Sequence, residues 1–142
     1  MQISRRADYG VRVILDLASL PLNVRASTHE ISSRQSIPAP FLAKIISQLA
    51  LAGLVTTHRG AGGGVTLARP SAQITLLHVI EALEGPLRLN RCLLQPDSCP
   101  LDRECPVHPV WARAQEDLSA LLSSTTFEEL VLDGSPRKPN GA

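Results

Sequence analysis

The segment that most restricts the fold of this 142-residue chain is a glycine-rich run between two short segments that are typical of β-strands. Residues 54–57 and 65–67 are the two strand-like segments, and the run His58-Arg59-Gly60-Ala61-Gly62-Gly63-Gly64 separates them. Four glycines in five positions favour neither a strand nor a helix, but they let backbone amides approach a phosphate closely while Arg59 projects from the tip. The pattern predicts a β-hairpin with a glycine-rich tip.

Three helices are expected before the hairpin. Apolar positions 10, 13, 14 and 17 recur with the period of one buried helix face, between Ser4 and Leu20. Ser27 and Glu30 form a capping-box pattern that starts a short second helix. A third helix opens with Pro40 in its first turn and has apolar positions 42, 45, 46 and 49 on one face. This layout is typical of a helix-turn-helix, and with the hairpin it predicts a winged helix.

The glycine run has two other interpretations, a flexible turn without a ligand and a nucleotide-phosphate loop. A phosphate loop of the Walker type needs a Lys-Ser or Lys-Thr pair after the last glycine and then a helix. Here Val65-Thr66-Leu67 follows the last glycine and is typical of a strand. We therefore favour a wing that contacts DNA.

The charge distribution supports a nucleic-acid face in the first half of the chain. Residues 1–69 hold eight Lys and Arg against three Asp and Glu, whereas residues 70–134 hold four against ten. A chain that is neutral in sum but basic in one half often binds nucleic acid through that half. Unevenly charged solvated surface is the alternative explanation.

The composition fits a single globular domain, with 44% apolar and 19% charged residues. This size excludes a large multi-domain enzyme. The chain contains no stretch of about 18 apolar residues, and its N-terminus lacks the apolar core of a signal peptide. We expect a cytoplasmic protein that does not bind membranes, with its thiols reduced.

A second cluster of helices is expected after the wing. Thr75 caps an amphipathic helix that ends at Gly85, and a long helix runs from Pro109 to about Ser123. Apolar positions 111, 114, 118 and 121 in the long helix resemble a heptad seam over two heptads. Such a stripe needs a cover, which is either the remainder of the domain or the same helix of a symmetric dimer partner.

All three cysteines lie between the last two of these helices, in the pattern C-x6-C-x5-C-x2-H that ends at His108. Thiolates and imidazole are ligands for zinc, copper(I) and iron–sulfur clusters. Gaps of six and five residues are wider than the knuckles of structural zinc sites, and they suit a cluster, in which each iron needs its own ligand. Zinc and unmetallated redox thiols remain open. A catalytic cysteine is disfavoured because no general base accompanies it, and we expect no enzyme.

These features together resemble a known family. They are Arg59-Gly60-x-Gly62-Gly63-Gly64 in the wing, Glu84-Gly85 at a helix end, the three-cysteine loop, and Thr126-Phe127-Glu128-Glu129-Leu130-Val131 near the end of the chain. The combination resembles the small bacterial winged helix-turn-helix iron–sulfur transcriptional regulators, the family containing IscR and NsrR, over residues 1–132. The resemblance implies a homodimeric repressor that binds a partly palindromic double-stranded DNA operator and senses iron or cluster supply, nitric oxide or redox state.

The resemblance also implies the metal ligands. Cys92, Cys99 and Cys105 match the cluster ligands of the family. The IscR-like branch adds a histidine three residues after the last cysteine, here His108, and a 2Fe–2S cluster; the NsrR-like branch has an aspartate in the first helix, here Asp8, and often a 4Fe–4S cluster. We favour His108 and 2Fe–2S because of the local spacing, with Asp8 as the alternative fourth ligand. A zinc-binding or thiol-redox DNA-binding regulator without a cluster, or a zinc-bound adaptor, is the alternative function.

The DNA contacts are expected on the third helix and on the wing. Outward positions of the third helix meet a DNA groove, where Lys44 offers a charged donor to phosphate or guanine. Arg59 is expected in the minor groove or at a base edge. The predicted contact residues are Thr28, Pro40, Phe41, Ala43, Lys44, Ser47, His58, Arg59 and Gly60.

The expected fold is mainly α with a small β-hairpin wing, in which a winged helix-turn-helix domain precedes a long C-terminal dimerisation helix. The winged domain spans residues 1–85, with the helix-turn-helix at about 27–52 and the wing at about 54–67. A cysteine-rich cluster-binding loop follows at 86–108, then the dimerisation helix and a short C-terminal helix at 109–132, and a disordered tail at 133–142.

Overall fold

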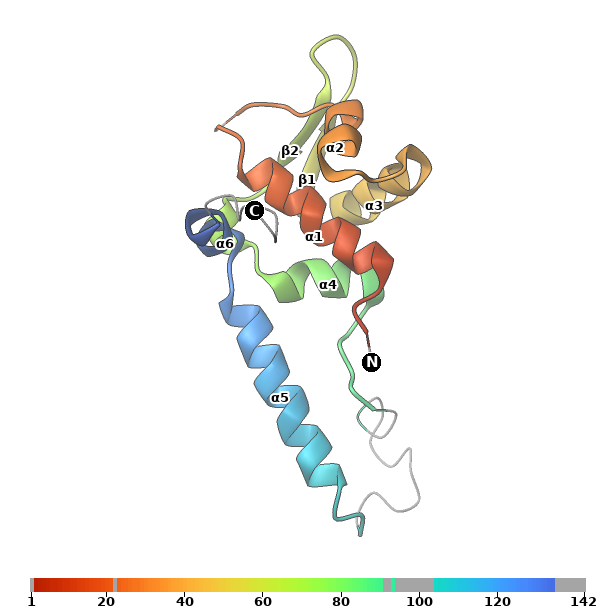
Figure 1. The fold of residues 1–142 in the computed structure, drawn as a ribbon, viewed down its shortest axis with the longest axis vertical. Helices are drawn as coiled ribbons and strands as arrows, with labels where there is room; N and C mark the ends of the chain where they lie inside the picture. The colour runs from red at the N-terminus through yellow and green to blue at the C-terminus, as the bar shows by residue number, and fades with distance from the viewer. Residues whose placement is uncertain (1, 22, 91–92, 94–103, 135–142) are drawn as a thin grey trace, which may run out of the picture.

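The computed structural model is mainly helical and describes residues 2–21, 23–90, 93 and 104–134. The tail expected to be disordered lies outside these residues from position 135 onward. The described elements in chain order are α1 (Arg5–Ala18), α2 (Thr28–Gln35), α3 (Ala39–Leu51), β1 (Val55–His58), β2 (Gly64–Leu67), the 3₁₀-helix η1 (Ser71–Gln73), α4 (Leu76–Glu84), α5 (His108–Ser124) and α6 (Phe127–Asp133), as Figure 1 shows. The expected fold class is confirmed.

Local sequence signals place the helix ends. The Ser27 side chain accepts a hydrogen bond from the Glu30 amide, and the Glu30 carboxylate accepts one from the Ser27 amide, so the predicted capping box is confirmed. Ser36 closes α2 in the left-handed conformation with φ of 53°. This turn lets α3 begin three residues later, with Pro40 in its first turn.

The hydrophobic core lies between α1, α3, α4 and the hairpin. The apolar face of α1 is buried at Val13, Ile14 and Leu17, as the periodicity predicts, and Gly10 packs against Leu83 of α4. A Cβ at Gly10 would clash with Leu83 Cδ1, so the two helices can approach this closely because position 10 has no side chain. The other fully or almost fully buried apolar residues include Ile31, Leu42, Ile45, Leu49, Val55, Val65, Ile74 and Val79.

The hairpin is antiparallel, with Val55 opposite Leu67 and His58 opposite Gly64. Ala26, in the segment before α2, adds a short bridge to the outer edge: it donates to the Val65 carbonyl at 3.1 Å and accepts from the Val65 amide at 2.8 Å. Gly64 has φ of 145°, and a Cβ there would lie 2.7 Å from the Ala26 carbonyl oxygen. The base of the wing is therefore attached to the segment that leads into α2.

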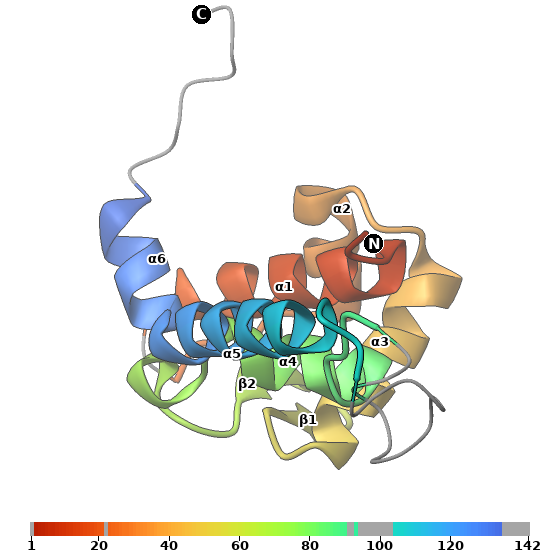
Figure 2. The ribbon, with the colours of Figure 1, turned by 90° about the horizontal axis from the view of Figure 1, so that it is seen from below.

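α5 projects from the body of the molecule, and α6 returns to it (Figure 1). Figure 2 shows α5 crossing beneath α1 and α4. The chain then pairs with the segment before α4, because the Leu76 amide donates to Thr125 and the Phe127 amide donates to Ile74. Phe127 is 0% exposed and lies in the same hydrophobic core as α1 and α4. Among the residues that the structure describes, no helix is both long and apolar enough to cross a membrane.

Candidate nucleic-acid interface and metal-ligand loop

α3 presents a solvent-exposed face on the side opposite to its buried residues. Leu42, Ile45, Ile46 and Leu49 point into the core, which leaves the intervening positions outside. Within the described part of the chain, Lys44 forms no ion pair with a carboxylate. The predicted contact residues of this helix are all exposed, and they are Pro40, Phe41, Ala43, Lys44 and Ser47.

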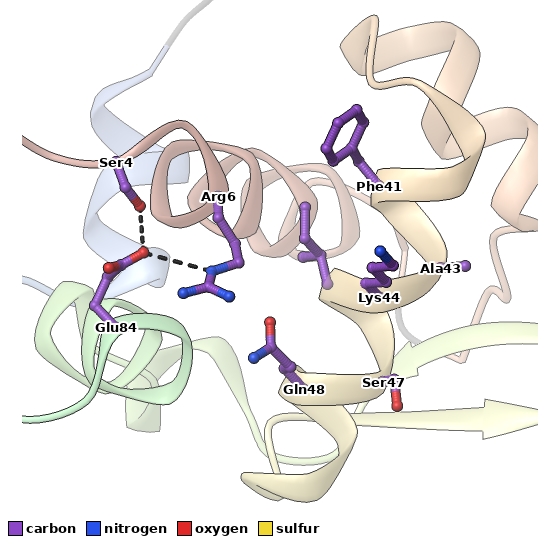
Figure 3. A pocket seen from close by; sticks show the side chains of 9 residues that line it. Ser4, Arg6, Phe41, Ala43, Lys44, Ser47, Gln48 and Glu84 are labelled. Atoms are coloured by element: carbon purple, nitrogen blue, oxygen red, sulfur yellow. Dashed lines mark hydrogen bonds and ion pairs between the residues drawn. The ribbon is translucent and has the colours of Figure 1, made fainter.

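A groove of about 850 Å³ separates α3 from the start of α1 and the end of α4 (Figure 3). We refer to it as the α3 groove. On one wall the Ser4 hydroxyl donates to the Glu84 carboxylate, and Arg6 Nε lies 3.6 Å from the same group. Lys44 and Ser47 lie on the opposite wall. Because the charges of Arg6 and Glu84 offset each other, Lys44 supplies the net positive charge of the groove lining, which suits an anionic partner.

The wing presents Arg59 and Gly60 at an exposed tip. His58 is half-buried, and its Nε2 lies 3.0 Å from the Thr66 hydroxyl across the hairpin, so this side chain is held against the wing. Arg25 donates from its guanidinium to the Gly62 carbonyl at 3.0 Å. Sequence reasoning missed Arg25, because a surface arginine before α2 has no motif that ties it to a loop 37 residues later.

A buried carboxylate fixes the orientation of α2 on α1. Asp16, 6% exposed, accepts hydrogen bonds from Arg34 Nε at 2.9 Å, Arg34 Nη2 at 2.8 Å and Gln35 Nε2 at 3.0 Å. Burial by itself raises the pKa of Asp16, but the hydrogen bonds from Arg34 and Gln35 and the charge of Arg34 together hold it below its ordinary value. Thr28, another predicted contact residue, is exposed in the first turn of the helix that this network holds.

Of the four favoured metal ligands, Cys105 and His108 are described, and a turn just before α5 brings their backbones together. Cys105 is a free, half-buried thiol, and its carbonyl accepts the backbone hydrogen bond of His108 at 3.3 Å. His108 is the first residue of α5. Cys92 and Cys99 lie outside the described residues. Within the described ranges, no group of three or more metal-binding side chains is present.

Asp8, the alternative fourth ligand, is not brought to this pair. It lies in the first turn of α1, where its carboxylate forms an ion pair with Arg12, with 2.9 Å between Asp8 Oδ2 and Arg12 Nη2. α1 lies in the body of the molecule, whereas α5 begins at its far end (Figure 1). Within one chain, Asp8 is therefore separated from Cys105 and His108.

α5 carries an exposed apolar stripe. Trp111 is 41% exposed and Leu121 is 62% exposed, and Ala114 and Leu118 between them are half-buried. Val107 and Val110 extend the stripe at the start of the helix. The predicted heptad seam therefore faces solvent along the described helix and is available to a partner.

The chain is similar to a family of regulators and to several solved structures over most of its length. The Rrf2 family model, described as iron-dependent transcriptional regulator, matches residues 3–133. The structure resembles CymR (YrzC), the global cysteine regulator of B. subtilis, with a TM-score of 0.77 and 30% identity over 94% of this chain and 98% of that chain. It also resembles IscR of T. potens, with a TM-score of 0.77 and 29% identity over 95% and 89% of the two chains. The oxidized form of Staphylococcus aureus CymR has a TM-score of 0.73 and 26% identity over 92% and 96%.

Proposed function

Because the chain belongs to the Rrf2 family of transcriptional regulators, we propose that it is a DNA-binding repressor whose operator affinity depends on an iron–sulfur cluster. The observation that supports the proposal is that a turn at residues 105–108, just before α5, places a free thiol, Cys105, close in the chain to an imidazole, His108. α5 leads on to α6, whose Phe127 lies in the core of the winged domain, so this end of the chain is connected to the DNA-binding elements through α5 and α6.

The proposed DNA surface consists of the outer face of α3 and the tip of the wing. Lys44 and Ser47 offer donors to phosphates or base edges, while Phe41 and Ala43 offer apolar contacts to thymine methyl groups. Arg59 reaches a neighbouring groove from the wing. Thr28 in the first turn of α2 is exposed and supplies a hydroxyl to the backbone. Pro40, His58 and Gly60 complete the proposed contact set.

The proposed active form is a homodimer that joins along the apolar stripe of α5. Rows of apolar side chains at a spacing of three and four residues pair well with a second copy of themselves. A dimer also places two winged domains on one operator, so a two-fold symmetric binding site is expected. In this arrangement Asp8 of α1 would join the metal centre from the second copy, since α1 and the start of α5, which carries His108, lie apart in one chain (Figure 1).

The residues proposed to hold the cluster are Cys92, Cys99, Cys105 and His108. The described pair fits the group, because a half-buried thiol and an imidazole at the N-terminus of a 17-residue helix provide soft donors where the helix dipole favours negative charge. A bound cluster supplies a centre that reacts with oxidants and nitric oxide. We propose the 2Fe–2S form with His108, and keep the 4Fe–4S form with Asp8 as the alternative.

Anaerobic purification followed by metal analysis tests this proposal. The expected protein is brown, contains iron and sulfide in equal amounts, and loses its visible absorbance in the Cys105→Ala variant while remaining folded. Gel shifts of the loaded and stripped forms on a duplex selected from random sequence should differ in affinity. A colourless protein with one zinc ion per chain would overturn the cluster and favour the zinc-binding regulator.

A thiol-redox regulator without metal is the second candidate. Cys105 is free and half-buried, and an oxidized form of a similar regulator, S. aureus CymR, has been solved. This candidate predicts a metal-free protein whose DNA affinity changes reversibly with peroxide and dithiothreitol. Mass spectrometry of the oxidised cysteines distinguishes it from both metal-bound forms.

A further inference from the structure

Gln115 uses both ends of its amide group on the backbone of another segment. Its Oε1 accepts a hydrogen bond from the Leu89 amide at 2.8 Å, and its Nε2 donates to the Leu87 carbonyl. The side chain is half-buried and projects from α5, two turns after His108. We refer to these two hydrogen bonds as the Gln115 clamp.

The clamp adds partners to a stretch of backbone outside any helix or strand, where the Leu87 carbonyl also accepts from the Arg88 guanidinium and the Asn90 carbonyl accepts from the Leu93 amide. α4 ends at Glu84, Gly85 forms its C-cap, and residues 86–90 have neither helical nor strand structure. Backbone donors and acceptors in such a segment need partners from elsewhere in the protein. The Gln115 amide supplies an acceptor to the Leu89 amide and a donor to the Leu87 carbonyl, two residues earlier in the same segment.

The clamp also connects both ends of the cysteine loop to one helix. Leu89 precedes Cys92 by three residues, and it is held to Gln115, two turns into α5. At the other end of the loop, Cys105 accepts a backbone hydrogen bond from His108, the first residue of the same helix. The described ends of the loop are therefore both tied to the N-terminal half of α5 before any ligand is bound, which reduces the conformational entropy that binding must remove.

We propose that Gln115 is a positioning residue for the metal centre, because it holds the segment before Cys92 against α5. This inference rests on the proposed function, since it assumes that the loop binds a metal group. Gln115 itself is not a ligand. It preorganises the loop, so its removal accelerates loss of the bound group and leaves the DNA-binding surface intact.

Two substitutions at Gln115 distinguish the contributions of the two hydrogen bonds. Gln115→Leu removes the donor and the acceptor at similar volume, whereas Gln115→Glu keeps an acceptor for the Leu89 amide and loses the donor to Leu87. Gln73→Leu is the matched control, because Gln73 is an exposed glutamine in η1.

The first measurement uses the metal-free full-length protein. Hydrogen exchange of the Leu89 amide should be about tenfold faster in Gln115→Leu than in wild type, while Gln115→Glu and Gln73→Leu stay near the wild-type rate. Trypsin should cleave after the exposed Arg88 about tenfold faster in both Gln115 variants. Wild-type rates in Gln115→Leu would show that the clamp does not hold this segment and would overturn the inference.

The second measurement uses the metal-loaded protein. Loss of visible absorbance to an iron chelator should be about tenfold faster in Gln115→Leu than in wild type or Gln73→Leu, with unchanged DNA affinity of the stripped forms. If the wild type binds iron but Gln115→Leu loses it at the same rate, the inference about Gln115 is overturned and the proposed function is not. A wild type that takes up neither iron nor zinc would overturn the proposed function, while the exchange and cleavage rates would still report on the clamp.

Discussion

At the scale of single residues, Arg59 and Lys44 carry the proposed DNA contacts. Arg59 is exposed at the wing tip, and Lys44 is exposed on the outer face of α3 with no ion pair among the described residues. Both could be identified from the sequence, because the glycine run and the helix period place them outside. The contacts of Arg25 and Asp16 could not be identified from the sequence, since their partners lie 37 and 18 residues away in the chain.

The two exposed cations are expected to act differently on DNA. Arg59→Ala should weaken specific binding by about 1–3 kcal/mol, because a base-edge or minor-groove donor is lost. Lys44→Ala should lower the slope of log K against log salt by about 1 if it neutralises one phosphate. Fluorescence anisotropy on a selected duplex across a salt titration checks both, with the exposed Arg113→Ala as control. Equal binding by Arg59→Ala and wild type at every salt concentration would remove the wing from the interface.

Asp16 predicts a specific pH dependence of stability. Its pKa is below the ordinary value in the folded protein, so the ionised carboxylate stabilises the fold at neutral pH. That contribution is present above about pH 4 and is lost as the pH falls through the folded pKa. Asp16→Asn should therefore lower the free energy of unfolding by about 2–4 kcal/mol at pH 7, and by less at pH 3. Urea denaturation at the two pH values checks this, and a pH-independent difference would contradict it.

At the scale of helices and strands, local sequence signals are strong where a cap or a glycine terminates an element. The capping box at Ser27, the Thr75 cap and the hairpin turn follow from residues within a few positions of each other. In the structure the His78 Nδ1 also accepts from the Thr75 amide and completes the cap of α4. Histidine is uncommon at this position, so the sequence predicts the Thr75 half of this capping box but not the His78 half.

The apolar stripe of α5 predicts an assembly defect at one position. Leu121→Asp places a charge in the proposed dimer seam, and because Leu121 is 62% exposed in the single chain, the fold of each chain should persist. Analytical ultracentrifugation should show a shift from dimer to monomer, together with a loss of operator affinity. Ser123→Asp, at an exposed position outside the seam, is the control. An unchanged dimer in Leu121→Asp would exclude this stripe as the interface.

At the scale of the whole molecule, the basic half and the acidic half have separate positions along the chain but share one core. Residues 1–69 have a net charge of +5 and contain the proposed DNA surface, whereas residues 70–134 have a net charge of −6 and contain the cysteine loop and α5. This polarity is expected to orient the basic half toward a phosphate backbone. Phe127 joins the halves, because it follows α5 in sequence and is buried with α1 and α4.

Phe127 therefore predicts cooperative unfolding. Phe127→Ala should lower the free energy of unfolding by about 3–5 kcal/mol, because it leaves a cavity where the first and last helices meet. In wild type, the fluorescence of Trp111 on α5 and the circular dichroism of the whole chain should report the same urea midpoint. Leu132→Ala, at a position 74% exposed, should change stability by less than about 0.5 kcal/mol. Separate midpoints for the two signals in wild type would contradict a shared core.

The sequence alone determined the helix-turn-helix, the wing, the exposed face of α3 and the spacing of the candidate metal ligands. These features depend on the period of apolar residues, on caps and on glycine, all of which act over a few residues. The tertiary structure decided which distant groups meet: Asp16 with Arg34, Arg25 with the wing tip, Gln115 with Leu87 and Leu89, and Phe127 with the core. Such contacts depend on how whole elements pack, and many polar side chains compete for each partner, so no local pattern specifies them.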